Sequence, residues 1–243
     1  MSHVSKASLA DSSQYESYSE SYFDTLYRGN TDPWQYQTRW YEKRKRDMCL
    51  AVLPQSQYKN GIELGCGNGV LSELLARRCQ ALVSLDGNHQ AVQLAKARLA
   101  ELSHVKVIQG VIPVKLFSLK AALLEAYPLA ENTPVMAAPF DLIVISEILY
   151  YLSPTDIDTV IAWIQQNLAI GGTLLCCHWR YAIEGFVMTG ETVHKRLHHA
   201  FNLMANDKHQ IAFNHQSQIL DSDFLLDVWQ RSQSSVARQE NLI

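Results

Sequence analysis

Three glycines alternate with other residues directly after a short apolar run, and an acid follows the next apolar run. Gly65, Gly67 and Gly69 come after residues 61–64, and Asp86 stands about 20 residues after Gly65. Glycines at the carboxyl end of a strand let a ligand approach the backbone closely. A carboxylate at the end of the next strand can accept hydrogen bonds from both hydroxyls of a ribose. The pattern predicts a nucleoside-binding site.

The spacing of the glycines narrows the kind of nucleoside. Dinucleotide sites need a third glycine three residues after the second, and that position is Val70 here. The GxxxxGK[ST] pattern of phosphate-binding loops is absent. A ribose-binding acid without a pyrophosphate loop indicates S-adenosylmethionine (SAM). The alternative is a tight strand–helix turn that binds nothing.

The elements that must position these residues alternate between buried strands and amphipathic helices. We expect strands at 61–64, 81–85, 105–108, 140–145 and 173–178, and helices at 40–53, 69–78, 88–102, 115–127, 155–168 and 192–204. Two more strand-like runs, 209–213 and 224–229, have no clear helix between them, which predicts an antiparallel pair at the sheet edge. The fold class is therefore α/β, with a seven-stranded, mostly parallel sheet covered on both faces.

Composition sets the domain organisation and excludes several kinds of partner. The chain has 243 residues, 47% of them apolar and 19% charged, which is typical of one globular domain, or of one domain with a lid. The net charge of −3 argues against a nucleic-acid or membrane-surface partner. The polar N-terminus shows no signal-peptide pattern, and the five cysteines include no CxxC pair. We expect a cytoplasmic monomer or homodimer.

The N-terminal region divides into two parts of different composition. Residues 1–19 are rich in serine and predict a flexible arm, whereas residues 20–55 are crowded with aromatic residues and predict a helical lid. This lid belongs to a main domain of residues 20–230, followed by a tail at 231–243. The charge run 43–46 on the lid's last helix is expected to be mostly solvated.

The glycine segment Glu63–Gly69, with the sequence ELGCGNG, resembles motif I of class I SAM-dependent methyltransferases. Further segments resemble the NodS-like group of that family, so that the likeness covers about residues 20–230: Asp32-Pro33-Trp34, Trp40-Tyr41-Glu42, 140–152 and 223–229. The resemblance implies a Rossmann-like fold and SAM as cofactor. It implies that Gly65, Cys66 and Gly67 lie against the methionine part of SAM, and that Asp86 binds the ribose.

Other positions are candidates for the rest of SAM. The segment after the third strand lies near the adenine in this family, and here it contains Gly110 and Val111 but no acid. Trp34 and Tyr41 are expected to fold over the mouth of the site, where an aromatic face near the sulfonium contributes ~0.5–2 kcal/mol. Arg44 is a candidate for the SAM carboxylate, and Ser146 for a cofactor contact at the end of the fourth strand. A solvated helix face is the alternative for Arg44.

Catalytic candidates must also stand at the carboxyl ends of the strands. Glu147 follows the fourth strand, His178 ends the fifth, and Tyr150 is close to Glu147 in the sequence. A general base would deprotonate an amine or hydroxyl acceptor. The alternatives are a capping role for Glu147, a core position for His178 and simple packing for Tyr150.

A metal site is not predicted. His194 and His198 have the i, i+4 spacing of a metal-binding pair on a helix, but no third ligand is apparent in the sequence.

The sequence is compatible with three functions. The first is methyl transfer to nitrogen or oxygen of a small molecule. NodS-type enzymes N-methylate an amino sugar, and the fourth strand ends in Ser146-Glu147-Ile148 rather than the Asn-Pro-Pro-Tyr of many macromolecule methyltransferases. The second is a cyclase that closes the SAM amine onto its own γ-carbon, giving azetidine-2-carboxylate and methylthioadenosine. The third is a SAM-fold protein without catalytic activity.

Overall fold

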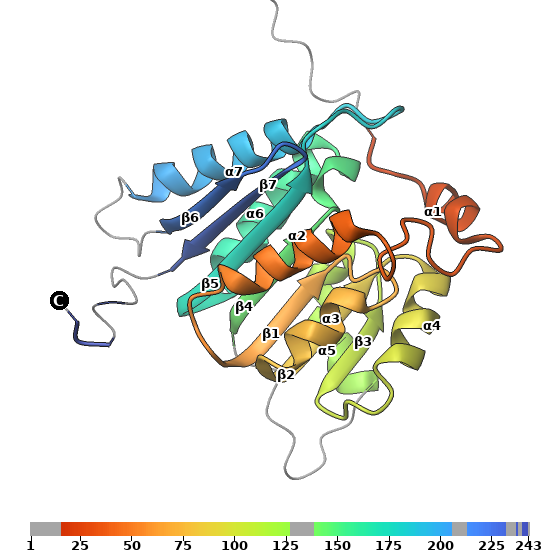
Figure 1. Cartoon of the computed structure of the whole chain (residues 1–243), viewed down its shortest axis with the longest axis horizontal. Coiled ribbons are helices and arrows are strands. Elements are labelled where there is room, and N and C mark those ends of the chain that lie inside the picture. The colour runs from red at the N-terminus through yellow and green to blue at the C-terminus, as the bar shows by residue number, and fades with distance from the viewer. Residues whose placement is uncertain (1–15, 127–138, 206–212, 232–236, 238–239, 243) are drawn as a thin grey trace, which may run out of the picture.

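The computed structural model describes residues 16–126, 139–205, 213–231, 237 and 240–242. Its centre is a seven-stranded sheet in the order β3-β2-β1-β4-β5-β7-β6 (Figure 1). The strands are β1 (Tyr58–Leu64), β2 (Cys79–Asp86), β3 (Val105–Gln109), β4 (Phe140–Ser146), β5 (Leu168–Trp179), β6 (Asn214–Leu220) and β7 (Phe224–Gln230). The first five are parallel, and β7 pairs antiparallel with both β5 and β6. The predicted α/β class and sheet are confirmed.

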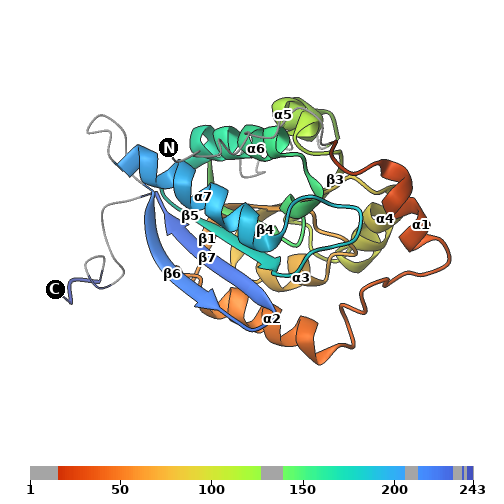
Figure 2. The ribbon, with the colours of Figure 1, turned by 90° about the horizontal axis from the view of Figure 1, so that it is seen from above.

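Helices cover both faces of the sheet, and a further helix lies at its side. The helices are α1 (Glu20–Tyr27), α2 (Trp40–Ala51), α3 (Val70–Ala76), α4 (His89–Arg98), α5 (Val114–Ala126), α6 (Pro154–Asn167) and α7 (Gly190–Ala205). Seen from above, α5, α6 and α7 lie over one face and α2 and α3 over the other (Figure 2). Helix α1 contacts α4 beside the sheet.

The central strands are buried on both sides, which explains why they appear in the sequence as continuous apolar runs. In β4, Ile143 and Ile145 belong to the core under α5, α6 and α7, whereas Leu142 and Val144 belong to the core under α2, α3 and α4. This alternation follows from the two-residue period of a strand. The result is a rigid platform whose parallel strands end at one common edge.

The largest differences from the expected element boundaries concern β6 and β5. The edge strand lies at Asn214–Leu220 rather than 209–213, of which residues 209–212 fall outside the described part. An edge strand pairs on one side only, so β6 carries the polar sequence NHQSQIL and escapes a search for apolar runs. Strand β5 begins at Leu168 and includes Gly171, because a register shift against β4 accommodates the extra residues.

The N-terminal segment joins the body earlier than the sequence predicts. The Tyr18 amide donates to the carbonyl of Tyr151 at 2.9 Å, and the Ser17 hydroxyl accepts from the Ser153 amide at 2.8 Å. Of the expected arm at 1–19, residues 1–15 fall outside the described part, as does most of the 231–243 tail. Among the described residues, no helix combines the length and apolar character needed to cross a membrane.

Candidate active site

A cavity of about 560 Å³ opens at the carboxyl ends of the parallel strands, beneath the N-terminal segment. From β1 the chain adds β2 and β3 on one side of the sheet, and then β4 and β5 on the other side. Ligands of such sheets bind at this switch point between β1 and β4. Gly65 after β1 and Ser146 at the end of β4 both line the cavity. The topology therefore places the cavity where the glycine pattern predicted a ligand.

Asp86, at the end of β2, is hydrogen-bonded to the glycine loop that follows β1. Its Oδ2 accepts the amide of Gly67 at 2.8 Å, and its Oδ1 accepts the amide of Asn88 at 2.8 Å. A carboxylate offers about four lone-pair positions, so acceptor capacity remains on the side that faces the cavity. Burial raises the pKa of Asp86, and the two amides oppose that rise. The carboxylate is therefore held in position by two backbone amides, one from the glycine loop and one from Asn88.

Gly65 has a left-handed backbone at the floor of the cavity, with a φ of 78°. A Cβ on this residue would lie 2.9 Å from the Cβ of Ile148, which follows Glu147 after β4. Only glycine combines this φ with such a close approach of the two strand ends.

Aromatic side chains from the N-terminal segment form a roof. The Trp34 and Tyr36 rings stack with centroids 5.6 Å apart, and Trp34 meets Tyr27 edge-on at 5.8 Å. Tyr36 and Tyr27 come close enough to Gly67 that a Cβ there would lie 3.4 Å and 3.5 Å from them. Burial raises the pKa of both phenols, so they stay protonated at neutral pH.

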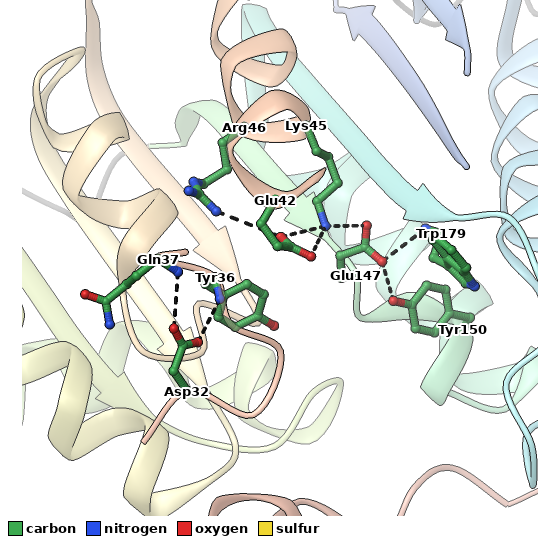
Figure 3. A network of polar contacts seen from close by, with 9 residues as sticks. All are labelled: Asp32, Tyr36, Gln37, Glu42, Lys45, Arg46, Glu147, Tyr150 and Trp179. Carbon is green, nitrogen blue, oxygen red and sulfur yellow. Dashed lines mark hydrogen bonds and ion pairs between the residues drawn. The ribbon is translucent and has the colours of Figure 1, made fainter. Parts of the chain in front are cut away.

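Asp32 ties this roof to the glycine loop. Its carboxylate accepts the amides of Tyr36 and Gln37 at 2.8 Å and 3.1 Å (Figure 3). The same carboxylate accepts the side-chain amide of Asn68 at 3.2 Å. Asp32 belongs to the segment Asp32-Pro33-Trp34 that resembles the NodS-like group. Its structural role, which is to link the aromatic roof to the glycine loop, was not apparent from the sequence.

A buried ion pair joins α2 to the end of β4. The Lys45 ammonium lies 2.9 Å from Oε1 of Glu147 and 3.0 Å from Oε2 of Glu42. Figure 3 shows Lys45 and Glu42 pointing from α2 toward Glu147. Burial disfavours the ammonium, but the two carboxylates outweigh it and raise the pKa of Lys45. The lysine is therefore a permanent cation inside the cavity wall.

Glu147 is held from its other side as well. Its Oε2 accepts the Trp179 amide at 3.0 Å and the hydroxyl of Tyr150 (Figure 3). Its backbone is left-handed, with a φ of 61°, which is rare outside glycine and asparagine. Three partners from three elements keep this carboxylate in a conformation that local sequence does not favour. Such an outlier is common at functional sites.

Comparisons with known proteins agree with this geometry. Residues 62–174 match a family model described as a methyltransferase domain. A Pseudomonas syringae protein assigned as a methyltransferase is 35% identical, with a TM-score of 0.58 over 79% of this chain and 99% of its own. The chain belongs to the class I SAM-dependent methyltransferase family.

Two relatives in the NodS-like group are informative. The N-methyltransferase NodS from Bradyrhizobium japonicum WM9, solved with S-adenosylhomocysteine, is 27% identical, with a TM-score of 0.66 over 86% of this chain and 97% of that one. Nodulation protein S of Rhizobium tropici is 30% identical over 172 residues, 67% of this chain and 62% of that protein. The match to this curated relative thus spans less than two thirds of its length.

Most residues predicted for the site of this methyltransferase line the cavity: Trp34, Tyr41, Gly65, Gly67, Asp86, Gly110, Ser146, Glu147 and Tyr150. Gly110 is fixed there because its amide donates to the carbonyl of Asp86 at 2.8 Å. Cys66 and Val111 are absent from the lining. Cys66 instead packs in the core beneath α3, and Val111 lies against Gly87.

Arg44 and His178 also lie away from the cavity. Arg44 pairs with Asp221 at 2.5 Å on the outer side of α2. His178 is fully buried, with its ring 5.5 Å from that of Tyr150, because the strand alternates and sends Trp179 to the cavity instead. Neither residue contacts the space in which a ligand fits.

Three residues that the sequence did not single out as site residues also line the cavity: Glu42, Lys45 and Tyr36. The expectation that the charge run 43–46 is mostly solvated was wrong, since Lys45 and Arg46 are buried. One signal was available: Glu42, Lys45 and Cys49 have the i, i+3, i+7 spacing of a single buried helix face.

Proposed function

We propose that this protein transfers the methyl group of SAM to an amine nitrogen of a small molecule. The observation that carries the proposal is one cavity that contains both Asp86 at the end of β2 and Glu147 after β4. Bound SAM supplies an activated methyl group on a sulfonium. The similar NodS structure, an N-methyltransferase solved with S-adenosylhomocysteine, supports the choice of nitrogen.

The residues around Asp86 fit the cofactor. Its carboxylate lines the cavity and has lone pairs that the Gly67 and Asn88 amides do not use, so it would accept the two ribose hydroxyls. Gly65 and Gly67 present backbone without side chains, which suits the methionine part. Gly110 and Ile112 from the segment after β3 line the same cavity and would contact the adenine.

Glu147 would hold the acceptor. Lys45, Tyr150 and the Trp179 amide occupy three of its lone-pair positions, which leaves about one for an N–H of the acceptor. A carboxylate there would orient the amine toward the methyl carbon and receive its proton. The aromatic roof of Trp34 and Tyr36 would exclude water from the reacting atoms.

The cavity supports a small acceptor. Its volume of about 560 Å³ lies within the range of roughly 300–1,000 Å³ that drug-sized ligands occupy. The cofactor takes a large part of that space. An amino acid, an amine or a small amino sugar is therefore favoured over a macromolecule.

The test is formation of S-adenosylhomocysteine with a panel of primary and secondary amines. The Glu147→Gln variant should lose at least 100-fold in kcat/KM while it still binds S-adenosylhomocysteine. Glu73→Gln, on α3 and outside the cavity lining, is the matched control and should react like the wild type. Turnover of Glu147→Gln at the wild-type rate would contradict the proposal for Glu147, and no turnover with any amine would contradict the acceptor class.

The aromatic enclosure favours one second candidate, in which SAM itself is the substrate. Tyr18, Tyr22, Phe23 and Trp34 line the cavity together, and such walls would desolvate the SAM amine. In that reaction the amine nitrogen bonds to the γ-carbon, the γ-carbon–sulfur bond breaks with its electron pair on sulfur, and the amine loses a proton. Incubation with SAM alone distinguishes the two: methylthioadenosine with azetidine-2-carboxylate supports the cyclase, and unchanged SAM supports methyl transfer.

A further inference from the structure

Four histidines gather around one buried carboxylate on the side of the sheet away from the cavity. Asp227 lies in the middle of β7 and is completely buried. His194 and His198 reach it from α7, and His215 reaches it from β6. His178 on β5 contacts His194. None of these residues lines the cavity of the active site.

Hydrogen bonds fix the tautomers on one side of this cluster. The Leu149 amide donates to Nε2 of His178 at 3.3 Å, so the proton of that ring lies on Nδ1. Nδ1 then donates to Nε2 of His194 at 3.0 Å, and Nδ1 of His194 donates to Oδ2 of Asp227 at 2.5 Å. This series of hydrogen bonds requires only neutral imidazoles and an ionised Asp227. The Oδ2 atom of Asp227 is thereby engaged by His194.

The other oxygen, Oδ1, faces two further imidazole nitrogens. Nε2 of His215 lies 2.5 Å away and Nε2 of His198 lies 3.2 Å away. His198 Nε2 is buried and makes no hydrogen bond to any residue that the structure describes. One carboxylate oxygen and two imidazole nitrogens offer three lone pairs at one place, and a cation binds such a set better than a second proton does.

We propose that His198, His215 and Asp227 form a site for a divalent transition metal ion, Zn²⁺ by preference. The three ligand atoms lie within 4.8 Å of one another. Zn²⁺ bonds nitrogen and carboxylate oxygen at about 2.0–2.2 Å, which separates ligand atoms in a tetrahedral site by roughly 3–3.6 Å. Two imidazoles and a carboxylate suit this ion.

The surroundings resemble those of a built metal site. His194 donates to the non-ligating oxygen of Asp227 at 2.5 Å, which is the role of an outer-sphere partner that orients a ligand. The side chains of His198 and His215 are about one third exposed, at 29% and 33%, so water can enter and complete the coordination. The ion would join α7, β6 and β7.

The experiment is a titration of the untagged protein with CoCl₂, followed by competition with ZnSO₄. One equivalent of Co²⁺ should give visible d–d absorption that Zn²⁺ abolishes. His198→Ala and His215→Ala should each weaken Co²⁺ binding by more than about tenfold, since even outer-sphere partners change affinity 10–100-fold. His199→Ala, an exposed histidine on the same helix, should bind like the wild type.

Protein stability provides the second measurement. Zn²⁺ should raise the melting temperature of the wild type and of His199→Ala, and this gain should be absent in the other two variants, because a ligand that binds only the folded state stabilises it. Circular dichroism checks that each variant is folded before titration. Absence of stoichiometric binding, or equal affinity in all three variants, would overturn the proposal.

Discussion

The ammonium of Lys45 lies 2.9 Å from the carboxylate of Glu147, a residue 102 positions later in the chain. This contact joins the lid helix α2 to the end of the strand that enters the active site. Both side chains are largely buried, and the positive charge of Lys45 compensates the negative charge of Glu147. The lid and the strand end are therefore coupled energetically.

Replacing Lys45 by methionine tests this coupling. The change leaves Glu42 and Glu147 buried without their cation, and breaking a buried pair in this way costs about 3–5 kcal/mol. Lys43→Met is the matched control, because Lys43 pairs with Asp47 on the exposed face of the same helix. Such surface pairs contribute about 0–1 kcal/mol. Urea denaturation measures both, and equal losses in the two variants would rule out a special role for Lys45.

The sheet and the glycine loop could be predicted because their signals are local. Doubly buried strands give continuous apolar runs, and the glycine spacing with Asp86 repeats the geometry of a nucleoside site within about 20 residues. Glu147 and Tyr150 were found because they follow a recognisable strand.

The rest of the site depends on contacts between distant segments. Lys45 stands in a run of charges that looks solvated, and only packing of α2 against the body turns it inward. His178 was placed on the wrong side of β5, because the exact phase of a strand's alternation at its end is set by its neighbours. Likewise, His178 on β5 and His215 on β6 belong to the histidine cluster, but no spacing in the sequence relates them to His194 and His198.

Asp86→Ala should weaken the binding of S-adenosylhomocysteine by about 1–3 kcal/mol, through loss of charge-assisted hydrogen bonds to the ribose. Calorimetry measures the change. Asp86 also accepts the amides of Gly67 and Asn88, so the variant should melt earlier than the wild type. Asp86→Asn retains an acceptor for one amide and should be intermediate in both measurements. Unchanged affinity in Asp86→Ala would refute the ribose assignment.

Gly65→Ala should damage the site by more than backbone strain alone. Gly65 and Gly171 both have left-handed φ values, 78° and 81°, and a non-glycine residue there costs about 1–2 kcal/mol. A Cβ at Gly171 meets nothing within 4 Å, whereas one at Gly65 would clash with Ile148. Gly65→Ala should therefore lose roughly 1–3 kcal/mol more than Gly171→Ala, the overpacking penalty, together with its affinity for S-adenosylhomocysteine. Equal denaturation curves for the two variants would contradict this account.

Glu63 makes stability depend on pH. This carboxyl, at the end of β1, is buried with Ser72 as its hydrogen-bond partner, and burial raises its pKa from 4.5 to about 8. The folded protein therefore binds a proton that the unfolded chain releases near its ordinary pKa. The stability from this group is complete below about pH 4.5 and declines as pH rises toward about 8, by at most about 1.4 kcal/mol per pH unit.

Glu63→Gln removes this titration and keeps an amide oxygen for the Ser72 hydroxyl. Between about pH 5 and about pH 8 the free energy of unfolding should fall less steeply in the variant than in the wild type, and near pH 8 the variant should be the more stable by a few kcal/mol. Glu73→Gln, at an exposed position on α3, is the control and should leave the slope unchanged. Urea denaturation at several pH values measures the slopes. Parallel curves for wild type and Glu63→Gln would mean that Glu63 is already ionised in the folded protein, with a cation or water compensating it.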